Sequence, residues 1–326
     1  MRSMSDAGSW AVRPCTTDDV QTVLTLVRAD EERVSGRPSR LVEGDVRDWW
    51  QTVDLAKESW LLVPPASDSG SGSRAGSGSG SGSDSGAAVG VVWLDRQGAG
   101  LAACFPIATD AQAVPALVDL AEGRAVDVGL ERLHVVVLVP DRAAEELLTA
   151  RGYREVRRFY DMAIELEAPP SPVDLPDGFS LGTATPEDGP AFHATITEAF
   201  EDHWESHPLP YDEWWRVRTG DPDFDISWWF TVRDGDEVVA AVRNVPARNG
   251  GVYVAALGVR RTWRGRGLAK ALLQHTFARA YEAGFPRITL GVDATNPTGA
   301  TALYRRVGMT VEHESAAWEK HLRQDA

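Results

Sequence analysis

Arginine and glycine alternate in the segment Arg264-Gly265-Arg266-Gly267-Leu268-Ala269. An apolar run predicts a strand at 252–259 just before this segment, and residues 270–282 have the pattern of a helix after it. The first backbone N–H groups of a helix have no partner within the helix, and the positive end of the helix dipole lies beside them. Because such an end attracts phosphate, the segment predicts a phosphorylated cofactor.

Two common nucleotide motifs do not fit this turn. A P-loop ends in lysine followed by serine or threonine, whose hydroxyl contacts Mg²⁺, but here Lys270 is followed by Ala271. The dinucleotide fingerprint has its third glycine where this chain has Lys270, and it needs an acidic residue closing a second strand about twenty residues later. The cofactor is therefore expected to be neither a nucleoside triphosphate nor a dinucleotide.

The same turn resembles the acetyl-coenzyme A loop of the GCN5-related N-acetyltransferases (GNAT family), in which Arg264, Gly267 and Ala269 match the fixed positions. A predicted strand at 287–292 follows. The residues after it resemble a second signature of the family, with Met309 replacing the usual aromatic residue; they are Asn296, Ala300, Leu303, Tyr304 and Gly308. The resemblance implies an α/β fold, with two tandem GNAT-like domains that each have a mixed, mostly antiparallel central sheet flanked by helices.

The resemblance also implies roles for single residues. Those expected to bind acetyl-CoA are Leu257, Gly258, Val259, Arg264, Gly265, Arg266, Gly267, Leu268, Ala269 and Asn296. Backbone N–H groups of 266–269 would face the pyrophosphate, and the strand edge at 257–259 would pair with the pantetheine arm. Tyr304 would protonate the leaving thiolate. The structural alternatives are a solvated basic turn, a helix cap at Asn296 and a core tyrosine at 304.

Acetyl transfer requires a neutral amine. A primary amine with a pKa near 10.4 costs roughly 4–5 kcal/mol to deprotonate at pH 7, so a base is expected. Glu198, Asp202 and His203 are the candidates. If the preceding helix continued, the carboxylates of Glu198, Asp202 and Glu205 would lie on one of its faces. The alternative is that they form a solvated acidic face without a catalytic role. Asp293 is a further candidate on the predicted strand.

Composition limits the partners of the chain. Its 326 residues are 43% hydrophobic and carry a formal net charge of −15, which argues against a nucleic-acid surface and suits a soluble protein or, alternatively, cationic substrates. Cys15 and Cys104 lie far apart and are expected to be small buried residues, so no metal site is expected. The start of the chain and the absence of long apolar runs predict a cytoplasmic protein without membrane contact, as a monomer or homodimer.

The chain also reads as a repeat around a proline-rich connection. We expect an N-terminal GNAT-like domain at 1–168, a linker at 169–178 and a catalytic GNAT domain at 179–326. Features recur in order on both sides; they are Thr16 and Thr185 as helix starts, Trp49-Trp50 and Trp214-Trp215, and Leu148 and Tyr304 before a glycine. The tryptophan pairs are expected in the core or between the domains, with some lining an acceptor cleft as the alternative.

The first copy has lost the features implied to bind the cofactor. Leu148 stands in place of Tyr304, Pro140 in place of Asn296, and residues 108–115 contain no glycine. The N-terminal domain is therefore expected to be a scaffold. Residues 67–86 are serine or glycine except at four positions, which predicts a disordered insertion in a hairpin between strands at 60–63 and 89–94.

The expected activity is acetyl-CoA-dependent N-acetylation of a primary amine on a small molecule, by direct attack in a ternary complex. The arrangement of one active and one inactive copy is similar to that of mycothiol synthase, so acetylation of a cysteinyl amine is an alternative. Acetylation of antibiotics or polyamines, suggested by the acidic composition, is another. A protein that binds acyl-CoA as a sensor, without turnover, is the alternative outside enzymes.

Overall fold

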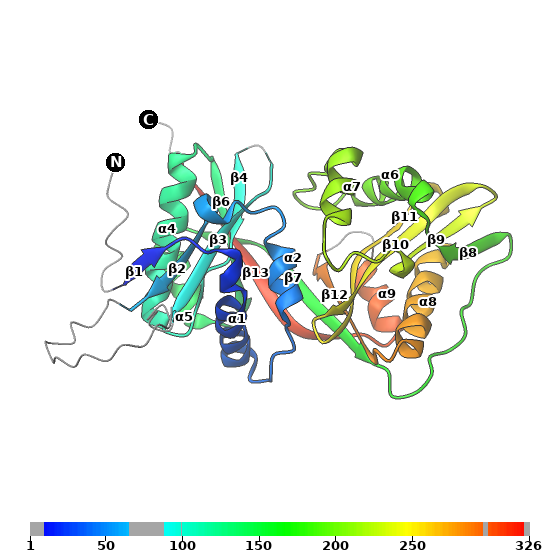
Figure 1. The fold of residues 1–326 in the computed structure, drawn as a ribbon, viewed down its shortest axis with the longest axis horizontal. Helices are drawn as coiled ribbons and strands as arrows, with labels where there is room; N and C mark the ends of the chain where they lie inside the picture. Colours follow the sequence, from blue (N-terminus) through cyan, green and yellow to red (C-terminus); the bar gives the residue numbers. More distant parts are fainter. Residues whose placement is uncertain (1–9, 65–87, 99, 296–298, 323–326) are drawn as a thin grey trace, which may run out of the picture.

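The computed structural model describes residues 10–64, 88–98, 100–295 and 299–322. The Ser/Gly insertion at 67–86 and Asn296 lie outside these residues, so both expectations stay predictions. Within the described ranges a single sheet runs through the whole molecule in the order β1-β2-β3-β4-β6-β13-β7-β12-β11-β10-β9-β8, with β5 beside β3. Helices cover this sheet (Figure 1). No helix in the described part of the chain is both long and apolar enough to cross a bilayer.

The N-terminal half, before the connection at 169–178, contributes the following elements. Its strands are β1 (Ala11–Arg13), β2 (Ser59–Val63), β3 (Gly90–Arg96), β4 (Leu101–Cys104), β5 (Ile107–Ala108), β6 (Arg132–Val139) and β7 (Arg154–Glu165). Its α-helices are α1 (Val20–Ser35), α2 (Glu43–Trp49), α3 (Leu55–Glu58), α4 (Val114–Asp127) and α5 (Arg142–Ala150), and short 3₁₀ turns lie at Thr17–Asp19 and Ala111–Ala113.

The C-terminal half follows a similar plan. Its strands are β8 (Phe179–Thr183), β9 (Trp229–Asp234), β10 (Glu237–Arg248), β11 (Gly251–Val259), β12 (Arg287–Asp293) and β13 (Thr310–His321). Its α-helices are α6 (Gly189–Phe200), α7 (Tyr211–Thr219), α8 (Leu268–Glu282) and α9 (Ala300–Arg306), with 3₁₀ turns at Pro186–Asp188, Ile226–Trp228 and Arg261–Trp263.

Several local expectations are confirmed by these bounds. Strands β11 and β12 and helix α8 lie where the sequence predicts them, with α8 starting two residues early at Leu268. Strands β2 and β3 form the predicted antiparallel pair that brackets the insertion. Thr16 and Thr185 both form capping boxes, in which the threonine and an aspartate three residues later satisfy the free N–H groups of a helix start. Local sequence therefore determines these features.

The aromatic repeats pack inside their own halves. Trp49 stacks on Trp93 with 5.9 Å between ring centroids, and Trp214 lies 5.5 Å from Trp229. Trp50 is buried, and Trp215 packs against the core of the C-terminal half. Fully burying a large apolar side chain stabilises a fold by about 1.5–3 kcal/mol, so these pairs help to hold the outer helices on the sheet. Cys15 and Cys104 are buried and unpaired, as expected.

The two halves exchange their last strands. Strand β7, from the N-terminal half, pairs antiparallel with β12 over seven residues, from Arg287 opposite Glu165 to Asp293 opposite Phe159. Strand β13, at the end of the C-terminal half, lies between β6 and β7 and pairs with both. Figure 1 shows β7 and β13 running side by side across the middle of the molecule. Each half is therefore completed by a strand from the other.

A buried arginine stabilises this junction. Arg287, at the start of β12, is buried and donates to Glu165 of β7 at 2.8 Å and to Glu312 of β13 at 3.0 Å. Its Nε also donates to the carbonyl oxygen of Asn249 at 3.1 Å. A buried guanidinium is tolerated when carboxylates and carbonyl groups satisfy its donors, so this cluster favours one register of the exchanged strands.

The exchange predicts that neither half folds alone. Residues 1–168 expressed separately would leave β6 and β7 without the strand between them, and exposed strand edges aggregate. We expect each fragment (1–168 or 169–326) to be insoluble or oligomeric, whereas co-expression gives a soluble one-to-one complex on gel filtration. Two separate monomers, each unfolding cooperatively in urea, would contradict this expectation.

Candidate active site

A wedge opens between two central strands of the C-terminal half. Strands β11 and β12 pair in parallel only at Val252–Ile288 and Tyr253–Thr289. Strand β10 follows β11 as far as Val259, with a register shift that leaves Ala255 unpaired as a bulge. Bulges bend and twist a strand, and this one lies where β11 leaves β12. The edge of β11 at 257–259, predicted to pair with the pantetheine arm, is therefore not paired with β12.

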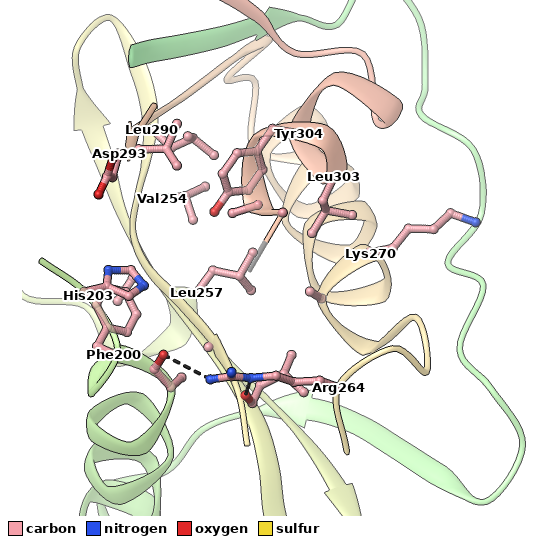
Figure 2. Close-up of a pocket in the computed structure, with 18 of the residues that line it drawn as sticks. Phe200, His203, Val254, Leu257, Arg264, Lys270, Leu290, Asp293, Leu303 and Tyr304 are labelled. Carbon is pink, nitrogen blue, oxygen red and sulfur yellow. Dashed lines mark hydrogen bonds between the residues drawn. The ribbon is translucent and has the colours of Figure 1, made fainter. Parts of the chain in front are cut away.

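The wedge forms one wall of a cavity of about 1030 Å³. The end of α6, the strands β11 and β12, the glycine turn, the start of α8, and helix α9 contribute its lining. Figure 2 shows Leu257 and Val254 on the strand wall, Lys270 and Leu303 on the helices, and Arg264 at the turn. Several predicted residues line this cavity; they are Leu257, Gly258, Val259, Arg264, Gly265, Gly267, Leu268, Ala269, His203 and Tyr304.

The glycine turn has the backbone geometry that phosphate binding requires. Gly265 and Gly267 have φ angles of 78° and 85°, a region that costs other residues roughly 1–2 kcal/mol. Gly267 caps α8, so the N–H groups of Leu268, Ala269 and Lys270 begin the helix without partners inside it. These donors and the helix dipole point to the same end, which fits the pyrophosphate of a coenzyme.

The arginines of the turn have structural partners. The side chain of Arg264 donates to the carbonyl oxygens of Val259 at 3.1 Å and Ala199 at 3.2 Å, so it ties the turn to β11 and α6. Arg266 is exposed and donates to the carbonyl oxygen of Thr262 at 3.3 Å. A direct contact of either guanidinium with the coenzyme remains a prediction.

Tyr304 lies on α9 with its ring buried and 8% of its surface exposed. Figure 2 shows its hydroxyl directed into the cavity, on the side of Val254 and Leu257. Burial raises the pKa of Tyr304 to about 12, so the hydroxyl keeps its proton at neutral pH. Within the described residues this hydroxyl has no hydrogen-bond partner, and it is free to donate to a ligand.

His203 reaches the cavity from the turn that follows α6. Its ring centroid lies 4.1 Å from that of Phe200, and Figure 2 shows both rings on the wall facing Tyr304. Burial lowers the pKa of His203, which makes the neutral imidazole the main form at pH 7. A neutral imidazole in a cavity can accept a proton, so His203 meets the requirements for a general base.

The carboxylates of Glu198 and Asp202 lie outside the cavity. Helix α6 ends at Phe200, so Glu198, Asp202 and Glu205 do not share one helical face and the expected arrangement is wrong. Glu198 accepts from Arg260 at 2.7 Å and from the backbone N–H of Arg261 at 2.8 Å. The hydrogen bond from Arg260 lowers the pKa of Glu198.

Asp202 is also bound to an arginine. It accepts from Arg261 at 2.8 Å, and this hydrogen bond lowers its pKa. Neither Glu198 nor Asp202 lines the cavity. Asp293 does line it, but Arg157 holds that carboxylate at 2.7 Å. A carboxylate held by arginine is a weak base. Of the candidates Glu198, Asp202 and His203, only His203 lines the cavity.

The N-terminal sheet anchors the loop that carries His203, which sequence analysis missed. Trp204 stacks on His134 of β6 with centroids 4.9 Å apart, and Arg157 of β7 lies over the same indole. Glu205 accepts from Arg132 of β6 at 2.7 Å. His134, Glu205 and Glu319 form a cluster in which Arg132 already supplies the positive charge between the two carboxylates. Partners so far apart in sequence leave no local signal.

The corresponding strands of the N-terminal half pair over a longer stretch. Strand β4 pairs with β6 at all four of its residues, from Leu101–Arg132 to Cys104–Val135, and the chain then continues as β5 beside β3 while β6 runs on to Val139. Leu148, at the position of Tyr304, is buried in the core of its half. The connection at Ala111–Ala113 contains no glycine. This geometry supports the expected scaffold role of the first half.

Residues 190–309, which hold the wedge, the glycine turn and Tyr304, match the model of the acetyltransferase (GNAT) family. The chain contains a GNAT domain. Its curated relatives include proteins named mycothiol acetyltransferase from Streptomyces scabiei, 32% identical over 185 residues, and Streptomyces coelicolor, 33% identical over 192 residues. These matches cover 55% and 57% of this chain, and the chain spans 58% and 60% of those relatives.

Solved structures agree over nearly the whole chain. A GCN5-related N-acetyltransferase from Sphaerobacter thermophilus superposes with a TM-score of 0.78 at 26% identity, covering 99% of this chain and 98% of that one. A tandem GNAT protein from the clavulanic acid biosynthesis pathway gives 0.68 at 15% identity, covering 97% and 100%. The expected fold class, tandem GNAT-like units around a mixed sheet, is confirmed.

Replacement of Gly267 by alanine should weaken coenzyme binding. A Cβ there would have room, with Pro176 Cγ at 3.9 Å, so the effect comes from the positive φ angle. Alanine pays roughly 1–2 kcal/mol for a positive φ angle, so the turn would relax to another conformation and its N–H groups would be misaligned. Calorimetry should then show coenzyme A binding that is about tenfold weaker. Gly284→Ala is the matched control, because Gly284 has a φ of 80° at the other end of α8. Equal affinities in both variants would rule out the role of Gly267.

Proposed function

We propose that the chain is an acetyl-CoA-dependent N-acetyltransferase that transfers acetyl to a primary amine of a small molecule. The observation that carries this proposal is the cavity that brings the glycine turn, the free edge of β11 and the Tyr304 hydroxyl to one place. The coenzyme supplies the thioester-activated acetyl group. Gly265, Gly267 and the start of α8 are suited to its pyrophosphate. The edge of β11 offers backbone donors and acceptors to its amide-containing arm.

Transfer would occur by direct attack in a ternary complex. The described residues place no cysteine in the cavity, since Cys15 and Cys104 are buried elsewhere, so an acylated-enzyme step has no nucleophile there. His203 takes the proton from the amine, which makes the nitrogen lone pair available to the thioester carbon. The N–C bond forms, the C–S bond breaks, and Tyr304 donates a proton to the departing thiolate. The new amide nitrogen releases its extra proton to solvent, and Tyr304 regains its proton from solvent.

A mycothiol-type reaction is the more specific candidate, and the curated relatives favour it because they are named mycothiol acetyltransferases. In that case the acceptor would be a cysteinyl amine. The acyl-CoA sensor is less well supported, because a protein that only holds the coenzyme needs neither a hydroxyl directed into the cavity nor a neutral imidazole opposite it. The cytoplasmic location and a monomeric or dimeric state remain part of the proposal.

Replacement of Tyr304 by phenylalanine tests the proposed acid. Loss of a general acid lowers rates by about 10²- to 10⁴-fold, so kcat should fall by this factor while the Kd for coenzyme A stays within about threefold. Thiol release from acetyl-CoA with a panel of amines gives kcat. Tyr281→Phe, in α8 outside the cavity, is the control and should keep the rate of the parent protein. An unchanged kcat in Tyr304→Phe would remove the acid from the mechanism.

The pH profile tests His203. Because its pKa is lowered, the base form dominates above that pKa, and kcat should rise with pH through a value below 6.5 and then level off. His203→Gln should flatten this limb and lower kcat by about 10²-fold or more. His275→Gln is the matched control, since burial also lowers the pKa of His275 but it lies outside the cavity. If the acid limb survives in His203→Gln, another group is the base.

A further inference from the structure

Arg243 has an unusual position on β10. Its neighbour Asn244 is buried on the side of α8, where it donates to Thr276 at 3.1 Å. Since successive side chains of a strand point to opposite faces, Arg243 lies on the other face, the side on which α6 packs. Figure 1 shows α6 and α7 on the opposite side of β10 and β11 from α8. The guanidinium is therefore on the face that continues toward the N-terminal half.

Arg243 is deep in the fold but lacks a bonding partner. Among the described residues it makes no hydrogen bond and no ion pair, and its side chain is neither fully buried nor fully exposed. The two arginines of this half that are fully buried, Arg248 and Arg287, differ because both contact carboxylates. Burial, followed by the charge of Arg218, lowers the pKa of Arg243 to about 10. Because the side chain keeps some exposure to solvent, its free N–H donors are accessible to a ligand as well as to water.

Arg218 on α7 is the second cation of the site. It donates to Gln51 of the N-terminal half at 3.4 Å, and its Nε is buried without a partner. The carboxylates of Asp48 and Asp221 lie nearby and act on both arginines through their charge. Neither forms an ion pair with Arg243 or Arg218, and both accept instead from the amide of Gln51, at 3.1 and 2.7 Å. The two guanidinium groups therefore retain unused donors.

The site adjoins the candidate active site. Arg243 pairs across the ladder with Ala256, and Ala256 lines the cavity. Tyr253, on the neighbouring strand, also lines it and interacts electrostatically with Arg243. Burial raises the pKa of Tyr253 to about 12, so its hydroxyl is a neutral donor. Gly291, next to it on β12, is exposed even though its strand is central, which leaves the floor of the cavity open here.

We propose that Arg243, assisted by Arg218, binds an anionic group of the amine acceptor, either a carboxylate or a phosphate. The inference rests on the proposed function, since it names the acceptor class for that cavity. Guanidinium groups bind such oxyanions through paired N–H donors, and Tyr253 adds a third donor at the edge of the site. The chain as a whole is acidic and repels anions. Arg243 and Arg218 form a local positive site within it, which favours an amine that carries an anionic group and disfavours the polyamines suggested by the composition.

Matched acceptors test the proposal through activity. The pairs are β-alanine with β-alaninamide, and phosphoethanolamine with ethanolamine, each followed by thiol release from acetyl-CoA. In one of the two pairs we expect the enzyme to prefer the compound that carries the acid group. A preference for β-alanine identifies the carboxylate as the bound group, and a preference for phosphoethanolamine identifies the phosphate. In Arg243→Gln the kcat/KM of the preferred acceptor should fall about 10- to 100-fold, while that of the matched acceptor without the acid group changes less than threefold. Arg243→Lys should retain part of the preference. Equal losses on both members of each pair would overturn the proposal.

A second measurement does not depend on turnover. Phenylglyoxal modifies arginine in the full-length protein, and peptide mass spectrometry reports the rate at Arg243. Phosphoethanolamine or β-alanine should slow modification at Arg243 at least fivefold, whereas ethanolamine and β-alaninamide should not. Arg305, which is exposed and outside the cavity, should react equally with and without each compound. Absence of protection by either anion overturns the inference, and protection without any acetyl transfer leaves it standing while the proposed function fails.

Arg305→Gln is the matched variant for charge. It removes one positive charge from the same half at an exposed position, so it controls for long-range attraction. Arg243→Gln removes an unpaired charge and should melt at the same temperature as the parent protein or higher, which separates lost binding from lost folding. If Arg305→Gln lowers the preference for anions as much as Arg243→Gln does, the local site is refuted.

Discussion

The wedge between β11 and β12 depends on how the backbone hydrogen bonds of these two strands are satisfied. A strand in the middle of a fold cannot leave both edges unpaired, because buried N–H and C=O groups without partners cost free energy. Strand β11 is paired by β10 on both sides of the bulge at Ala255, and β12 is paired by β7 over all seven of its residues. With one edge of each strand satisfied in this way, the facing edges can separate after Tyr253 and Thr289. The cavity and the placement of Tyr304 on its wall follow from that separation.

The exchanged strands give the degenerate half a direct role in this arrangement. The partner of β12 is β7, which belongs to the N-terminal half, and the loop with His203 and Trp204 rests on β6 and β7. A half that has lost the glycine turn thus supports both sides of the cavity in the other half. The buried cluster around Arg287 determines how the two halves meet.

Sequence patterns predicted the parts that depend on neighbouring residues. The turn at Gly265 and Gly267, the start of α8 and the position of Tyr304 follow from motifs within a few turns of chain. The end of α6 at Phe200 was missed because side chains from elsewhere, such as Arg260 and Arg261, hold Glu198 and Asp202. The strand exchange depends on pairing between segments more than a hundred residues apart, which no local pattern encodes. The lack of a bonding partner for Arg243 likewise depends on the positions of distant side chains.

The continuous sheet restricts how the molecule can move. Domains joined by a flexible segment often close on a ligand by hinge rotation, but a hinge between these halves would have to break the ladders of β13 and β7. Motion near Arg243 and Arg218 must therefore come from the helices around them. Helix α7 and the residues just after α2 meet through Gln51, whose amide touches Asp221 and Arg218. Small shifts of these helices over a rigid floor are the motion that this architecture permits.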